Sequence, residues 1–508
     1  MTQKRDAAWL AGLWALATAY NLTKPYHIDD AAHLFIAQWI ALHPLHPMRG
    51  LLNWTGTPLP ISATNQPHLY FYALAAWGSL FGWSEVAMHA LQSVFTGACI
   101  LLMYRLARRL VPRQALFLTA MLALNPAFFV EQNLMVDVPL LSFWLGFFAA
   151  LLEGRFGLAG LACAGALLIK YSSLCLLPIL GLTAFAAGQL WCLCIPLGAL
   201  AAWSGFNLWD YGGVHLLTGF HSGAASYAVP VHKSFPLARR LVKSVIAWDV
   251  AVGALSPFGI LAAVRGKWPY TILVAGFVAL GLGVAFGVVP DVPSDHLLWL
   301  GFAISGVAGL ALLRRPTDRA GRILWLWVVI TSAFYVLLAP CIAARHVLLI
   351  LPALALLAGR GRAISGPAQV FGIGMSAVLS LGLGLSDYRF AAFHRNEASA
   401  IAASFPGQRV TVAGHWGWQY YAAQHGMAEL DTLHPPPPGS ILAVPREVDH
   451  TLPPGLKLRL LRTDTANLSA LDPLCTARPS RFYLSYTFRG PWSLSAACTQ
   501  TTDFFAVR

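Results

Sequence analysis

The sequence predicts a mainly α, polytopic transmembrane helical protein with a small C-terminal α/β soluble domain. Three observations support this fold class. Of the 508 residues, 57% are hydrophobic and only 11% are charged, whereas a soluble domain carries about 25% charged residues. The apolar residues form blocks of membrane-spanning length, separated by short charged loops. After residue 385 the composition shifts to that of a soluble protein.

The apolar blocks predict about 13 spans, most of them roughly 17–25 residues long and some shorter. The first block follows a short basic start and lacks a small-residue cleavage site, so we expect it to remain as a span. The predicted spans are Ala7–Leu22, His89–Leu106, Gln114–Val130, Val138–Leu152, Phe156–Ile169, Ser172–Ala187, Leu190–Leu208, Leu241–Val264, Tyr270–Val289, His296–Leu313, Ile323–Ala339, Val347–Ala358 and Ala368–Leu385.

The distribution of basic residues predicts the orientation. In a soluble protein, a net charge of +13 would suggest nucleic-acid binding. Here most Lys and Arg lie in short loops, where they mark the cytoplasmic side. We therefore expect no nucleic-acid partner, an inner-membrane location, a cytoplasmic N-terminus and a periplasmic C-terminal domain. The predicted cytoplasmic loops hold Arg105, Arg108, Arg109, Arg113, Arg155, Arg265, Lys267, Arg314, Arg315, Arg319, Arg322, Arg360 and Arg362, while Arg239, Arg240 and Lys243 oppose the trend.

Two predicted outer segments are large. Within the membrane domain, residues 1–385, the loop 23–88 carries Asp30–Leu42 and Leu69–Phe81, which we expect to be helices lying along the membrane surface. The second segment is the tail, residues 386–508. Its patterns predict strands at Arg409–Gly414, Ser440–Pro445 and Leu456–Leu461 and a helix at Trp418–His425.

Only two of the cysteines, Cys475 and Cys498, lie in the predicted exported tail. In an oxidising compartment, two such cysteines favour a disulfide over two unpaired thiols.

Asp29 and Asp30 follow the first span at the predicted outer interface. Adjacent carboxylates beside an apolar surface are costly unless they are paired or used. Such a carboxylate could act as a general base for an acceptor hydroxyl or amine, or help to hold a divalent cation. Asp30 could instead cap the helix that follows, and we favour function for Asp29 because capping needs only one carboxylate.

Further candidates lie on the same predicted face. Asp137, just before a Val-Pro pair, could cap a helix or approach the same polar cleft as Asp29. Lys170, at the end of a short span, could extend to the interface or neutralise a phosphate. Arg345, followed by His346, is suited to bidentate phosphate binding. The histidines of the first outer loop match no metal motif.

Together these motifs resemble those of bacterial family-39 glycosyltransferases. That group is similar to protein O-mannosyltransferases and lipid A aminoarabinose transferases, all of the C-type membrane glycosyltransferase fold. The resemblance covers nearly the whole chain. It is carried, in order, by Asp29-Asp30, Asn65-Gln66-Pro67-His68-Leu69-Tyr70, Val136-Asp137-Val138-Pro139-Leu140, Ile169-Lys170-Tyr171-Ser172, Arg345-His346-Val347-Leu348 and, in the tail, Gly414-His415-Trp416-Gly417-Trp418-Gln419-Tyr420-Tyr421.

The resemblance implies an inverting glycosyltransferase that moves a sugar from a polyprenyl-phosphate donor in the membrane lipid to an unidentified lipid, glycan or protein acceptor. It implies Asp29 as catalytic base with Asp30 as alternate. Asp137 would support the base or the acceptor. The donor phosphate would be bound by Lys170, Arg345 and His346. Cations suit that role because negative charge grows on the phosphate as the glycosyl bond breaks.

The chain departs from the family pattern in the first loop. The family often carries an acid or a lysine where this chain has the neutral Asn65 and Gln66. We expect these residues and His68 to form an acceptor or metal region. A divalent cation there is left open, and we expect an acceptor different from that of the aminoarabinose enzymes.

Two other functions remain as alternatives. A transporter or flippase of lipid-linked sugar would place its ionisable residues within the spans, whereas here they gather at the outer surface. Alternatively, the tail could be a glycan-binding module, with the membrane part as its anchor. The chain has no phosphate-binding glycine-rich loop, no paired CxxC zinc site and no nucleophile-elbow serine.

Overall fold

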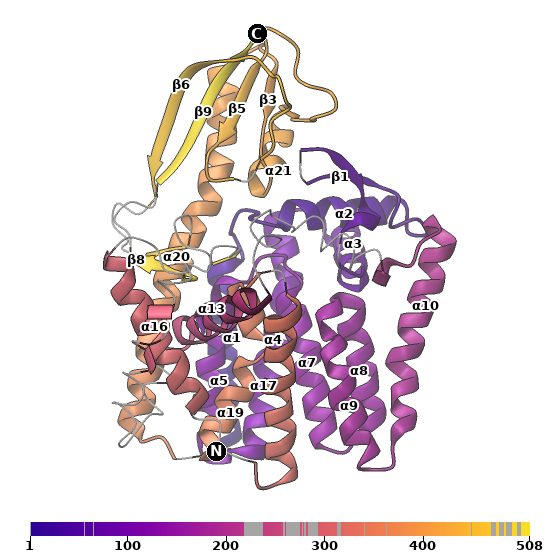
Figure 1. Cartoon of the computed structure of the whole chain (residues 1–508), viewed down its shortest axis with the longest axis vertical. Coiled ribbons are helices and arrows are strands. Elements are labelled where there is room, and N and C mark those ends of the chain that lie inside the picture. Colours follow the sequence, from indigo (N-terminus) through magenta and orange to yellow (C-terminus); the bar gives the residue numbers. More distant parts are fainter. Residues whose placement is uncertain are drawn as a thin grey trace.

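The computed structural model describes residues 2–54, 56–64, 66–217, 237–257, 260, 275–276, 278, 281–282, 293–311, 316–339, 341–361, 363–448, 450–468, 474–476, 482–483, 490–494 and 499–508. Helices form the lower part of the molecule, and the strands of the tail stand above them (Figure 1). Asn65, Cys498, most of the predicted span Tyr270–Val289 and the basic residues Arg265, Lys267, Arg314, Arg315 and Arg362 lie outside the described residues.

The helical part confirms a multi-pass membrane protein. Its helices are α1 (Thr2–Asn21), α4 (Glu85–Leu110), α5 (Ala115–Ala123), α6 (Pro126–Val130), α7 (Asp137–Leu152), α8 (Phe156–Ile169), α9 (Leu176–Phe185), α10 (Cys194–Tyr211), α13 (Leu237–Leu255), α16 (Pro293–Ala311), α17 (Arg319–Leu338), α18 (Ala344–Leu348), α19 (Leu351–Gly361) and α20 (Gly366–Ser404). Within the described residues, 4 helical segments are long and apolar enough to cross a membrane: Glu85–Leu110, Leu190–Tyr211, Arg319–Leu338 and Gly366–Ser404. Other apolar helices are shorter, so the number of spans stays a prediction.

Two predicted spans are broken in the structure. The expectation of one helix over Gln114–Val130 is wrong, because Asn125 separates α5 from α6. Its side chain accepts a hydrogen bond from the backbone N–H of Ala127 at 2.9 Å and donates to Leu255 O at 2.7 Å, and a proline begins α6. The segment Val347–Ala358 is likewise divided between α18 and α19.

The last predicted span ends too early. Instead of ending at Leu385, α20 continues to Ser404 and has 39 residues. Residues just past the expected end, Ser386 and Asp387, are buried, because other parts of the chain pack against this half of the helix. In Figure 1, α20 connects the helical bundle to the tail.

The predicted outer loop, residues 23–88, holds two helices with the predicted bounds, α2 (Asp30–Leu42) and α3 (Leu69–Phe81). A short antiparallel hairpin between them, β1 (Leu51–Asn53) with β2 (Pro58–Pro60), was not expected. These elements lie between the bundle and the tail strands (Figure 1).

The tail forms a sheet with the strand order β4-β3-β5-β9-β6. The strands are β3 (Val410–Val412), β4 (Ala428–Glu429), β5 (Ile441–Pro445), β6 (Leu458–Asn467) and β9 (Thr499–Val507), and helix α21 (Gly417–Gln424) follows β3. The predicted helix and strand positions are confirmed, except that β6 is longer than predicted, and β4 and β9 were missed. In the sheet, β3 is parallel to β5, and β9 is antiparallel to β5 and β6.

A second, two-stranded pair joins β7 (Leu474–Cys475) to β8 (Ser493–Leu494). The side chain of Cys475 and the whole of Cys498 lie outside the described part, so the disulfide stays a prediction.

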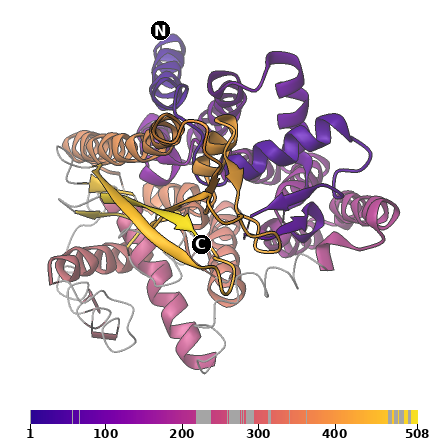
Figure 2. The ribbon, with the colours of Figure 1, turned by 90° about the horizontal axis from the view of Figure 1, so that it is seen from above.

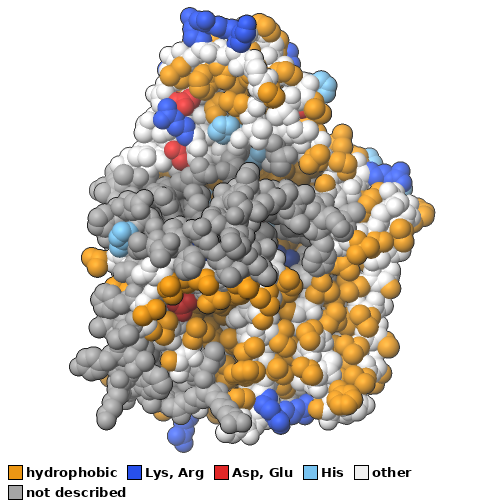
Figure 3. All heavy atoms as spheres, viewed as in Figure 1, with side chains coloured by type: hydrophobic (Ala, Val, Ile, Leu, Met, Phe, Trp, Pro, Cys, Tyr) orange, Lys and Arg blue, Asp and Glu red, His pale blue; other side chains and the backbone are white. Residues whose placement is uncertain are grey.

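Basic residues at the ends of helices and in the loops next to them, called the basic loops below, gather at one end of the bundle. Arg108 Nη1 lies 3.2 Å from Asp6 Oδ2 near the start of α1, and Arg105 Nη2 lies 2.7 Å from Glu153 Oε1 just after α7. Patches of Lys and Arg side chains lie at the lower margin of Figure 3, and hydrophobic side chains cover much of the described surface above them. Seen from above, the tail strands cross the middle of the molecule, with α10 at the edge opposite α20 (Figure 2).

Candidate active site

Asp29 and Arg345 meet at the end of the bundle away from the basic loops. Asp29 Oδ2 lies 3.8 Å from Arg345 Nη1, and the two side chains are 23% and 15% exposed. Asp29 stands at the N-cap position of α2, but its side chain makes no capping hydrogen bond. Its carboxylate therefore combines access from outside with a neighbouring cation.

A second acid–cation pair joins α7 to the end of α8. Lys170 Nζ donates a hydrogen bond to Asp137 Oδ1 at 2.7 Å. Asp137 is buried, and within the described residues its Oδ2 has no hydrogen-bond partner. The expectation that Asp137 caps α7 is wrong, because Val136 holds that position. Lys170 points at a carboxylate rather than only extending to the interface.

Arg345 connects the two pairs electrostatically. Burial lowers the pKa of Arg345, but the carboxylates of Asp29, Asp137 and Glu131 outweigh burial, so its pKa lies above the ordinary value. The guanidinium therefore stays charged at every accessible pH. An unpaired buried charge would be costly, and these acids offset that cost.

Glu131 is an acid that sequence reasoning did not select. It is fully buried, and neither of its carboxylate oxygens has a hydrogen-bond partner within the described residues. Burial raises the pKa of the Glu131 carboxyl well above its usual value, although Arg345 opposes this rise. A carboxyl in this environment favours the neutral form.

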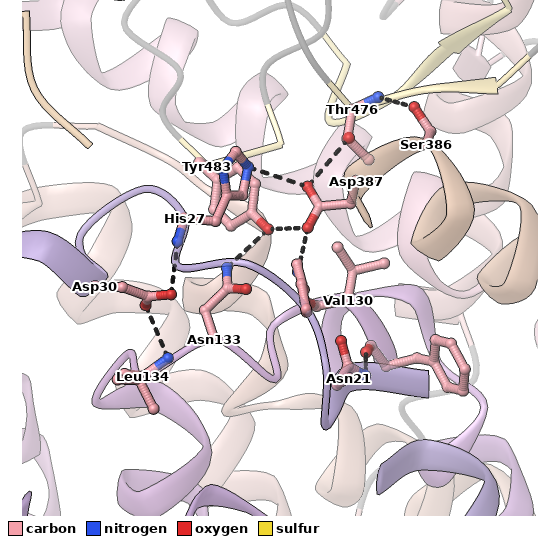
Figure 4. Close-up of polar contacts among 12 residues, drawn as sticks. Asn21, His27, Asp30, Val130, Asn133, Leu134, Ser386, Asp387, Thr476 and Tyr483 are labelled. Carbon is pink, nitrogen blue, oxygen red and sulfur yellow. Dashed lines mark hydrogen bonds and ion pairs between the residues drawn. The ribbon is translucent and has the colours of Figure 1, made fainter. Parts of the chain in front are cut away.

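Asp30 joins two loops instead of capping α2. Its Oδ2 accepts a hydrogen bond from His27 N and its Oδ1 accepts one from Leu134 N, both at 2.8 Å (Figure 4). The side chain is fully buried, and burial raises the pKa of Asp30 to about 8. Asp29, not Asp30, is thus the acid of this pair that a substrate can reach.

A buried network behind Asp29 involves residues that motif reasoning missed. Lys24, fully buried, pairs with Asp387 of α20 and donates to Val130 O at 3.3 Å. Tyr483 lies between Asn133 and Asp387 in Figure 4, donating to Asp387 Oδ2 at 2.8 Å and accepting from Asn133 Nδ2 at 2.9 Å. No local pattern marks these residues, because they are far apart in the sequence.

Two further candidates, His346 and His68, have partners other than Asp29. His346 Nδ1 accepts a hydrogen bond from Ala343 N at 3.3 Å, and its ring stacks on Tyr335 at 4.6 Å. His68 is fully buried, with its ring 6.2 Å from that of His215. Within the described residues, no group of three or more His, Cys, Asp and Glu side chains is arranged to hold a metal ion.

The fold and this site define a class: a multi-pass membrane protein whose acids and cations gather in pairs at one end of its helical bundle. Comparison with known proteins shows what one segment of the chain is similar to. Residues 65–205 match the family of dolichyl-phosphate-mannose-protein mannosyltransferases. This segment of the chain is similar to that family, in agreement with the resemblance inferred from the sequence. The matched segment contains Asp137 and Lys170 but neither Asp29 nor Arg345.

Two solved structures align with most of the chain at low sequence identity. ArnT from Cupriavidus metallidurans bound to undecaprenyl phosphate has 12% identity, a TM-score of 0.44 and coverage of 98% of this chain and 97% of that chain. The apo oligosaccharyltransferase of Archaeoglobus fulgidus has 11% identity, a TM-score of 0.49 and coverage of 84% and 64%. At these TM-scores the similarity carries no argument about function. No curated protein matches the chain.

Proposed function

We propose that this protein is an inverting glycosyltransferase that moves a sugar from a polyprenyl-phosphate donor to an acceptor on the outer face of the membrane. The observation that carries the proposal is the partly exposed Asp29 carboxylate 3.8 Å from the Arg345 guanidinium. The family matched by residues 65–205 is named for a lipid-phosphate sugar donor, which fits a site that combines a base with cations.

In this mechanism Asp29 accepts the proton of an acceptor hydroxyl or amine. The freed electron pair forms the new bond to the anomeric carbon, and the bond from that carbon to the phosphate oxygen breaks. A single displacement inverts the anomeric centre, and polyprenyl phosphate leaves as an anion. Arg345 and Lys170 stabilise the charge that grows on this phosphate, because cations held in place need no reorganisation.

Lys170 can take part although it is already paired. An ammonium group has three N–H donors, and the bond to Asp137 uses one of them. Its side chain is 16% exposed, so a phosphate can approach it. Asp137 then acts as a positioning residue that aims the ammonium group.

The orientation forms part of the proposal. We place the N-terminus in the cytoplasm and the tail outside the inner membrane, with the acceptor approaching from the tail side. The basic residues that meet around Asp6 and Glu153 support this placement, since positive loops stay in the cytoplasm.

The test is transfer of sugar from polyprenyl-phosphate sugars by the purified full chain in lipid. Asp29→Asn removes the base at nearly constant shape, and we expect the rate to fall about 10²–10⁴-fold, the usual contribution of a general base. Asp464→Asn is the matched control, because Asp464 is a half-exposed tail residue paired with Arg462. Full activity of Asp29→Asn would refute the proposal, and movement of donor across the bilayer without a new glycosidic bond would favour the flippase alternative.

A further inference from the structure

The backbone is strained immediately before Asp29. Within the described residues, Ile28 and Trp416 are the non-glycine residues with positive φ, at 49° and 67°. A β-branched residue in this region is a genuine outlier, and such strain persists only where the surroundings over-determine it. Ile28 is also buried. Something in the fold must therefore hold this segment in place.

Ile28 and Trp416 come from distant parts of the chain, but both lie close in sequence to one contact, in which Gly417 meets the backbone of Tyr26. Gly417, the residue after Trp416, begins α21 against the backbone of Tyr26. A Cβ atom added at Gly417 would lie 2.0 Å from Tyr26 O and 3.4 Å from His27 Cα. Only glycine allows α21 to start at this distance from the first loop.

A hydrogen bond one turn further along α21 strengthens the contact. Tyr26 N donates to the Tyr421 hydroxyl at 2.8 Å. That hydroxyl in turn donates to Glu85, whose carboxylate pairs with Arg395 Nη1 at 3.1 Å. Figure 1 shows α21 close to α2, the helix that Asp29 precedes.

The same segment also rests on α20. The His27 ring packs edge-on against Phe390 at 4.7 Å, and its Nε2 lies 3.6 Å from Asp387 Oδ1. The segment from Tyr26 to Ile28 is thus in contact with both α20 and α21. Asp29 has no capping bond of its own, so the path of this segment decides where its carboxylate points.

We propose that α21 of the tail is a positioning element, in which Gly417 and Tyr421 hold residues 26–28 in the strained conformation that aims Asp29 at Arg345. This inference rests on the proposed function for its catalytic consequence. The mechanical coupling between α21 and the loop does not depend on that function. The tail is then required for catalysis without touching the reacting atoms.

The experiment uses the full chain in lipid with two variants. Gly417→Ala introduces the clash with Tyr26, and alanine otherwise favours a helix more than glycine does. Tyr421→Phe removes the partner of Tyr26 N–H with little change in shape. The matched controls are Gly374→Ala, a helical glycine with no neighbouring atom within 4 Å of the added Cβ, and Tyr72→Phe, whose hydroxyl bonds to Pro44 O. The readouts are kcat, KM for the lipid donor, and hydrogen exchange of the peptide containing Tyr26.

We expect both variants to speed exchange around Tyr26 and to lower kcat while KM for the donor stays constant. A misplacement of about 1 Å can cost roughly 10²-fold in rate, so kcat should fall by about 10-fold or more. Unchanged exchange in both variants, or faster exchange with wild-type kcat, would overturn the inference. If the wild-type chain transferred no sugar, the proposed function would fail, while the exchange data would still support or overturn the coupling.

Discussion

Buried charges at the scale of single residues hold the candidate site together. Lys24 and Asp387 are both fully excluded from solvent, yet each is paired and hydrogen-bonded. Desolvating two ions is expensive, and a buried ion pair is retained only when partners satisfy its polar atoms. Here those partners are Val130 at the end of α6 and Tyr483, so the pair and its partners join four distant segments behind Asp29.

Breaking this pair should destabilise the protein strongly. Lys24→Met or Asp387→Asn leaves one uncompensated buried charge, and we expect a cost of about 3–5 kcal/mol in the free energy of unfolding. Because the residues touch, the double variant should cost less than the sum of the two. Unfolding of the detergent-solubilised chain, followed by circular dichroism against denaturant, measures these differences.

The matched control for that series is Arg462→Met. Its partner is Asp464, and both side chains are 45% exposed, so this pair should contribute only about 0–1 kcal/mol. Equal losses for the buried and the exposed pair would show that Lys24 and Asp387 are not coupled as the structure has them.

Helix contacts at the scale of elements depend on glycines where two backbones approach closely. A Cβ at Gly253 of α13 would lie 1.8 Å from Phe302 O of α16, and one at Gly306 of α16 would lie 2.1 Å from Asp249 O of α13. Small residues allow helices in a membrane to pack through their backbones, where no hydrophobic driving force exists between them.

Gly253→Ala should therefore push α13 away from α16. We expect a loss of about 1–3 kcal/mol, as for other over-packed contacts, and a lower thermal midpoint in lipid nanodiscs. Gly301→Ala provides the comparison, because this glycine lies on the same α16 and a Cβ there meets no atom within 4 Å. A thermal midpoint for Gly253→Ala equal to that of Gly301→Ala would contradict the close contact.

The whole molecule has two chemically different ends. One carries the basic loops, where Arg108 pairs with Asp6 and Arg360 Nη2 lies 2.7 Å from Asp318 Oδ2. The other carries the acid–cation pairs, with the first outer loop and the tail above them (Figure 1). Such polarity matches the orientation that we propose, because it separates topology-setting charges from those that meet a substrate.

Labelling tests that orientation directly. In a background with all native cysteines replaced, Lys457→Cys lies on the exposed part of the tail and Arg109→Cys lies at the exposed basic end. We expect an impermeant maleimide to label Lys457→Cys in intact spheroplasts and Arg109→Cys only after permeabilisation. Labelling of both from the same side would refute the orientation.

Local patterns in the sequence were sufficient for much of the fold. The bounds of α2 and α3 and the positions of β3, β5 and α21 were predictable because side-chain periodicity and turn residues are read within a few positions. The break at Asn125 was not predictable in the same way. Hydropathy averaged over a window of residues stays high when a single residue in it is polar. The hydrogen bond from Asn125 to Leu255 also depends on a helix that is far away in the sequence.

By itself the sequence determined that the chain spans a membrane, which residues form α2 and α3, and that Asp29, Asp137, Lys170 and Arg345 are candidates. Only the tertiary structure decided that Arg345 pairs with Asp29 and Lys170 with Asp137. The tertiary structure also placed the buried residues Glu131, Lys24 and Asp387 next to the candidate site, and it brought α21 into contact with the strained residues 26–28. The reason is physical: hydropathy is a property of neighbouring residues, whereas charge pairing and strain depend on which distant segments the packing of helices brings into contact.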